Sequence, residues 1–163
     1  MAACGYVVFA YLERLAAQGE LIYQDDTAVR ILPLMAENDH ASAPERTGMY
    51  TTALVVKVGA QTLWLYDAGR AHAGEHLQAL LTQRAIAQGP PLVMSEALAS
   101  HEADDTRLSR CPCLAHGRCK CRALEEPLPA ACRVVLDALA QVFDPDEEAR
   151  ARQRRAEERL AYH

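Results

Sequence analysis

The 163-residue chain is long enough for one domain with a hydrophobic core and too short for two domains of ordinary size. Half of the residues are apolar and 24% are charged, as in globular proteins, and the apolar run at residues 5–11 is about a third of the ~20 residues that a transmembrane helix needs. With no basic residue before this run and no small-residue cleavage site after it, we expect a cytoplasmic protein without a signal peptide or membrane partner. The net charge of −5 argues against a surface that binds nucleic acid by electrostatics alone.

The first part of the chain predicts a helix followed by a strand. Residues 1–19 carry apolar side chains at helical spacing, and Gly19 is a suitable stop. Residues 21–32 are rich in β-branched and aromatic side chains and predict a strand that ends at Pro33. Residues 38–47 are polar and are predicted to form a loop.

The middle of the chain predicts two paired strands, a crossover helix and a further strand. Residues 49–58 and 61–66 form the predicted hairpin around Gly59 and Ala60. A helix is expected over 71–88 and a short apolar strand over 92–95.

The remaining residues predict helices. They are expected at 115–126, at 128–143 with a break at Asp144-Pro145, and at 146–160, where almost every residue is charged. Three strands, a helix and a fourth strand predict a mixed sheet covered by helices, of class α/β or α+β.

Carboxylates stand in two of the predicted strands, at Asp25 and Asp26 and at Glu96. A strand carboxylate among apolar residues must be hydrogen-bonded, paired or metal-bound, and only one of two successive residues can face a given site. Asp25 (or Asp26) and Glu96 on neighbouring strands would suit Mg²⁺ or Mn²⁺. In the alternative interpretation, the aspartates cap a strand end and Glu96 opens a helix.

Four cysteines form a second candidate site around His116. Zinc binding would use Cys111, Cys113, Cys119 and Cys121. One residue between paired cysteines is tighter than the usual two to four, so the sequence also suits reduced thiols. The same segment is locally basic, and His116, Arg118 and Lys120 are candidates for DNA contact, although such cations can equally form a solvated face.

Five segments in collinear order, within residues 17–163, carry a family resemblance. They are residues 21–32, 48–52, 66–76, 89–98 and 113–121. Together they resemble the catalytic domain of DDE transposases of the insertion-sequence-66 class. The resemblance implies a ribonuclease-H-like sheet in which the first and fourth strands bring two catalytic carboxylates together, Mg²⁺ or Mn²⁺ as cofactor, and DNA element ends as partner.

The resemblance assigns Asp25 as the first catalytic residue and Glu96 as the second, where the family usually has aspartate. It also implies a third acidic ligand, in a later motif with asparagines before a Glu-Arg pair, that has no counterpart here. Glu147-Glu148-Ala149-Arg150 and Glu157-Glu158-Arg159 are interpreted as solvated helix faces. We therefore expect a truncated copy with an incomplete fold that is inactive in transposition.

The expected layout is an N-terminal helix (1–19), a catalytic-domain portion (20–126) and a helical extension (127–163). Two other functions stay open. One is a non-enzymatic DNA- or protein-binding module, zinc-stabilised or not, that modulates a full-length transposase or binds itself. The other is a standalone nuclease whose third carboxylate is Asp104 or Asp137.

Overall fold

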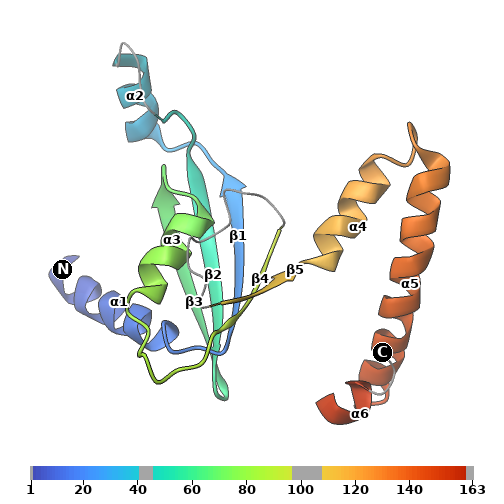
Figure 1. The fold of residues 1–163 in the computed structure, drawn as a ribbon. Coiled ribbons are helices and arrows are strands. Elements are labelled where there is room, and N and C mark those ends of the chain that lie inside the picture. Colours follow the sequence, from blue (N-terminus) through green and yellow to red (C-terminus); the bar gives the residue numbers. More distant parts are fainter. Residues whose placement is uncertain (1, 41–45, 97–107, 161–163) are drawn as a thin grey trace. The chain divides into compact units, whose positions relative to one another are not determined.

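The structure is a computed structural model that describes residues 2–40, 46–96 and 108–160. It divides into two compact units, residues 1–112 and residues 113–163 (Figure 1). The first unit contains α1 (Ala2–Ala16), β1 (Leu21–Ala28), α2 (Leu32–His40), β2 (Tyr50–Val58), β3 (Gln61–Gly69), α3 (Ala73–Leu81), β4 (Leu92–Ser95) and β5 (Ser109–Pro112). The second contains α4 (Leu114–Ala123), α5 (Pro129–Ala151) and α6 (Ala156–Leu160).

The first unit is built on a five-stranded mixed sheet in the order β3-β2-β1-β4-β5. The β1, β2 and β3 strands are antiparallel neighbours, and the predicted hairpin turn at Gly59 adopts a positive φ of 55°. Glycine tolerates this conformation, which two-residue hairpin loops need at their first position. The β4 strand pairs with β1 in parallel, and β5 pairs with β4 in parallel. The predicted mixed α/β sheet is therefore confirmed.

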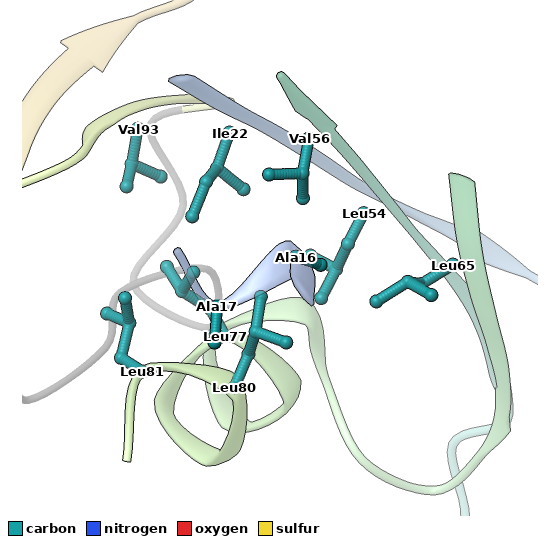
Figure 2. Packing of buried hydrophobic residues seen from close by; sticks show 10 residues of the cluster. All are labelled: Ala16, Ala17, Ile22, Leu54, Val56, Leu65, Leu77, Leu80, Leu81 and Val93. Carbon is teal, nitrogen blue, oxygen red and sulfur yellow. The ribbon is translucent and has the colours of Figure 1, made fainter. Parts of the chain in front are cut away.

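One face of this sheet carries the hydrophobic core. Alternate strand residues such as Ile22, Leu54 and Val56 point to this face, because side chains alternate between the two sides of a strand. Helix α3 covers them with Leu77, Leu80 and Leu81, and the end of α1 adds two buried alanines (Figure 2). The helix predicted over 1–19 is thus part of the sheet unit.

Two elements of the first unit were not predicted, and β1 and α3 are shorter than predicted. The chain leaves β1 at Ala28 and begins α2 at Leu32, with Pro33 in the first turn, where proline costs no helix hydrogen bond. Strand β5, Ser109–Pro112, is added to β4 at the edge of the sheet. Helix α3 ends at Leu81, and residues 82–88 form turns where the helix was predicted to continue.

The second unit pairs α4 with α5. Helix α5 runs from Pro129 to Ala151 through Pro145, so the predicted break at Asp144-Pro145 is wrong. Proline keeps a helical φ but removes its own backbone donor and crowds the carbonyl group of Gln141, and the helix nevertheless continues to Ala151, with Ala149 1% exposed. Helix α4 packs against α5, and both belong to the unit that begins after Pro112.

Candidate metal centre on the sheet

Asp25 and Glu96 lie together just beyond the end of the parallel pairing between β1 and β4, Asp25 within β1 and Glu96 directly after β4. The parallel pairing of β1 with β4 ends at Tyr23 and Met94, and each carboxylate lies two residues further along its strand direction. Because side chains repeat every second residue, both point to the same face of the sheet as these two residues. A carboxylate oxygen of Asp25 lies within 4.8 Å of one of Glu96.

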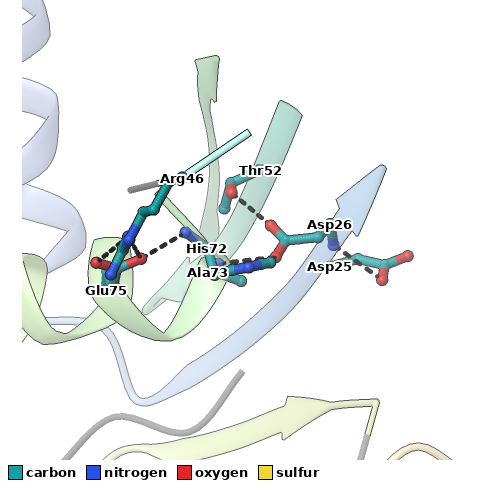
Figure 3. Close-up of polar contacts among 7 residues, drawn as sticks. All are labelled: Asp25, Asp26, Arg46, Thr52, His72, Ala73 and Glu75. Carbon is teal, nitrogen blue, oxygen red and sulfur yellow. Dashed lines mark hydrogen bonds and ion pairs between the residues drawn. The ribbon is translucent and has the colours of Figure 1, made fainter. Parts of the chain in front are cut away.

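Asp26 points to the opposite, core-facing side of β1 (Figure 3). Its side chain is 6% exposed. One carboxylate oxygen accepts a hydrogen bond from the Thr52 hydroxyl of β2. The other accepts one from the backbone N–H of Ala73 at 3.0 Å and lies 3.1 Å from Nδ1 of His72. Of the two adjacent aspartates, Asp25 is therefore the one that shares a face with Glu96.

The first turn of α3 extends this polar network to the surface. Glu75 accepts a hydrogen bond from the backbone N–H of His72 at 2.9 Å and pairs with Arg46 at 2.8 Å. The ring of His72 lies 4.1 Å from that of Tyr50. A carboxylate three residues after the start of a helix satisfies a free N–H and suits the positive end of the helix dipole.

The Glu75 contacts predict a small acid dependence of stability. The His72 N–H and the Arg46 guanidinium hold the pKa of Glu75 below its usual 4.5. Its contribution is therefore fully present above pH 4.5 and is lost as the pH falls through the lower folded-state pKa. For this half-exposed group we expect Glu75→Gln to cost about 0.5 kcal/mol at pH 7.

Urea unfolding of both proteins at pH 7 and at pH 3 measures this difference. The two free energies of unfolding should converge at the lower pH. An undiminished difference at pH 3 would show that the Glu75 charge is not its cause.

The cysteines do not form a compact ligand set in the described residues. Cys111 lies in β5, Cys113 precedes α4, and Cys119 and Cys121 lie within α4. Two helical residues separated by one position do not face each other, so Cys119 and Cys121 point to different sides of the helix. Among the residues that the structure describes, no group of three or more potential metal ligands contains a cysteine. Burial raises the pKa of the Cys132 thiol, which disfavours the thiolate form that binds metals.

The candidate DNA contacts His116, Arg118 and Lys120 all lie on α4 in the second unit. Arg118 and Lys120 are exposed, and His116 is partly buried. A groove of about 340 Å³ between α4 and α5 is lined by arginines and carboxylates. Its lining includes Arg118, Arg122 and Arg133 together with Glu125, Asp137, Asp144 and Glu147, so the acidic groups outnumber the arginines there.

The acidic residues at the C-terminal end form ion pairs within the second unit. Glu148 pairs with Arg152, and Asp146 pairs with both Arg150 and Arg159. Hydrogen bonds from Arg159 lower the pKa of Asp146. Of the other candidate third carboxylates, Asp137 lies on α5, 3.5 Å from Arg133, and Asp104 lies outside the described residues.

A sequence comparison identifies the family. The family described as "Transposase IS66 family" matches residues 7–163. The chain belongs to this family. The sheet with order β3-β2-β1-β4-β5 is accordingly the ribonuclease-H-like sheet of an IS66 transposase domain, as predicted. No curated protein and no solved structure matches the chain. None of the described helices is both long and apolar enough to cross a membrane.

The donors at the sheet centre fit the divalent metal that DDE chemistry in the IS66 family implies. Carboxylate oxygens are the ligands that Mg²⁺ and Mn²⁺ prefer, and the two groups approach within 4.8 Å of each other. Asp25 and Glu96 would hold such an ion through their carboxylate oxygens, and the ion would supply a positive charge beside a phosphodiester.

Sequence reasoning missed the residues that contact Asp26, namely Thr52, His72 and the N–H of Ala73. Only one local signal pointed to His72. It precedes a helix with a glutamate three residues later, which is typical of a helix N-terminus. Its contact with Asp26 spans 46 residues of sequence, so no local pattern contains it.

Proposed function

We propose that Asp25 and Glu96 hold a divalent cation, Mg²⁺ or Mn²⁺, and that this centre acts on phosphodiester bonds at DNA ends during transposition. The observation that carries the proposal is the approach of the two carboxylates within 4.8 Å at the ends of adjacent parallel strands, in a chain of the IS66 transposase family. A bound divalent ion would polarise the phosphodiester and lower the pKa of the attacking hydroxyl.

The protein contributes position and charge. Asp25 is held by the backbone N–H of Asp26, and Glu96 follows a strand whose Val93 is packed in the core. Asp25 therefore stands within a strand and Glu96 directly after one, which favours a fixed geometry. Glutamate at position 96 adds one methylene, and displacements near 1 Å cost up to ~100-fold in rate.

We also propose that this chain alone does not carry out strand transfer. The third acidic ligand that the family resemblance implies follows a run of asparagines, and Asn38 is the single asparagine of the sequence. Asp146 and Glu148, in the charged helix, are engaged by arginines. Incubation with labelled element ends in Mn²⁺ tests this part, and joined products from the purified chain would contradict it.

Mn²⁺ binding tests the proposed centre directly. The signal of free Mn²⁺ in electron paramagnetic resonance gives the affinity of the full chain and of its variants. We expect Asp25→Asn and Glu96→Gln each to weaken binding by about 100-fold, since each replaces a negatively charged carboxylate by a neutral amide. Glu96→Asp should retain binding, because it keeps the carboxylate.

Asp67→Asn is the matched control. Asp67 is also a strand carboxylate, but it lies on β3 and pairs with His76 of α3 at 3.7 Å on the other face of the sheet. Its removal should leave the Mn²⁺ affinity within about twofold, since it is not a ligand. Equal affinities for the wild-type protein and Asp25→Asn would refute the centre. Bound zinc that is lost on Cys119→Ser would favour the binding-module alternative.

A further inference from the structure

We infer that Asp26 is a positioning residue, which fixes the orientation of the Asp25 carboxylate through the backbone that the two residues share. The inference rests on the proposed function, because that function is what gives the orientation of Asp25 a purpose. It assigns a separate task to each aspartate of the pair. Asp25 is the ligand, and Asp26 is its internal anchor.

The Asp26 side chain is held by contacts from three directions. Its carboxylate is 6% exposed and receives hydrogen bonds from Thr52 on β2 and from the N–H of Ala73 at the start of α3. His72 contributes the third contact at 3.1 Å. A buried carboxylate requires such partners, and a negative charge at a helix N-terminus is stabilised by the helix dipole. The Asp26 side chain therefore has one fixed place.

This fixed residue reaches Asp25 directly. The backbone N–H of Asp26 donates a hydrogen bond to Oδ1 of Asp25 at 3.0 Å. The direction of that N–H depends on the peptide plane between the two residues, and the anchored Asp26 side chain restrains this plane. The Asp25 side chain is thereby held, pointing away from Thr52 and His72 (Figure 3), and its carboxylate lies within 4.8 Å of that of Glu96.

This task of Asp26 is separate from general support of the fold. Helix α3 is already attached to the sheet by Leu77, Leu80 and Leu81, which are each at most 3% exposed. Asp67 and His76 form a second acid–histidine contact between the sheet and the same helix. Of these two aspartates, Asp26 combines such a contact with a backbone hydrogen bond to a proposed ligand.

Asp26→Asn in the full chain tests the inference. Asparagine has the same shape, but it is neutral and its amide nitrogen cannot accept a hydrogen bond, so one of the two positions that the carboxylate oxygens occupy loses its acceptor. Three-bond couplings from the Asp25 Cγ to its backbone N and C′, measured by nuclear magnetic resonance, report the χ1 rotamer of Asp25. We expect one staggered rotamer in the wild-type protein and averaged couplings in Asp26→Asn, together with Mn²⁺ binding weakened by about 10-fold.

Two further variants make the result decisive. Thr52→Val removes one donor with little change in shape and should act in the same direction, with a loss of Mn²⁺ affinity of about threefold. It carries the test if Asp26→Asn does not fold. Asp67→Asn should leave both the Asp25 couplings and the Mn²⁺ affinity unchanged.

The two readouts separate the two proposals. Unaveraged Asp25 couplings in folded Asp26→Asn, or in Thr52→Val if the former is unfolded, overturn the positioning inference. If Asp26→Asn averages the Asp25 couplings but Asp25→Asn has no effect on Mn²⁺ affinity, the metal centre is refuted and the positioning of Asp25 by Asp26 is retained. A third outcome is that Asp26→Asn averages the Asp25 couplings but leaves the Mn²⁺ affinity unchanged, while Asp25→Asn weakens Mn²⁺ binding as expected. Positioning by Asp26 would then not serve the metal, and this outcome also overturns the inference.

Discussion

Replacing Arg84 by alanine is expected to lower the free energy of unfolding of the sheet unit by about 3 kcal/mol, because hydrogen bonds from a charged donor contribute ~1.5–3 kcal/mol each. The Arg84 guanidinium joins three points of the chain. It donates to the carbonyl oxygens of Ala17 and Gly19, at 2.8 and 2.7 Å, and to that of Gly89 at 2.6 and 3.0 Å. Burial lowers its pKa, in keeping with a cation that is partly removed from water.

Urea unfolding followed by tryptophan fluorescence measures this loss. The single tryptophan, Trp64, lies in β3 and therefore reports on the sheet unit. Arg84→Lys keeps the charge but not the planar fork of donors, so it should recover only part of the loss. The neighbouring Gln83→Ala serves as control and should change the free energy by less than about 0.5 kcal/mol. Arg84→Ala with wild-type stability would contradict the role of the guanidinium.

Gly19→Ala is expected to destabilise the same corner by about 3 kcal/mol, at the upper end of the usual cost of overpacking. A Cβ atom at this position would lie 2.1 Å from Cγ1 of Val56 and 2.8 Å from the carbonyl oxygen of Lys57. Val56 is fully buried and cannot move aside. The backbone cannot retreat easily either, because the next residue, Glu20, donates to the same Lys57 oxygen at 3.0 Å.

Gly69→Ala provides the control for this substitution, since a Cβ there would meet nothing within 4 Å. The same urea experiment should give a change of less than about 0.5 kcal/mol. A double mutant with Val56→Ala should be less destabilised than the sum of the two single changes, because the smaller side chain relieves the clash. Strict additivity would place the origin of the Gly19 effect elsewhere.

The strands that carry the candidate site were predictable because their signals are local. Val93 and its neighbours form a short apolar run before Glu96, and β-branched and aromatic residues surround Asp25. The family resemblance then placed the two strands side by side. The sequence pattern alone did not decide whether Asp25 or Asp26 shares a face of the sheet with Glu96, because that choice depends on which face α3 covers. That is a tertiary property.

The elements that were not predicted also depend on tertiary contacts. Strand β5, Ser109–Pro112, shows no apolar alternation and is defined by backbone pairing with β4. Pro33 and Pro145 were both interpreted as ends of regular structure, yet each lies within a helix. Proline in a first turn loses nothing, and in α5 the loss of one backbone donor is outweighed by side-chain contacts on both sides of Pro145.

The opposed directions of Asp25 and Asp26 have a consequence for how this gene can change. Deleting a single codon in the stretch for Leu21 to Gln24, with the β1 pairing otherwise kept, would turn every following side chain to the other face of the sheet. Asp26 would then point to the face that Asp25 shares with Glu96, and Thr27, which has no carboxylate, would replace it beneath α3. A point substitution changes one of the two aspartates, whereas a change of length by one residue changes the surroundings of both at once. Copies of this gene that keep their fold should therefore conserve the length of β1 more strictly than its side chains.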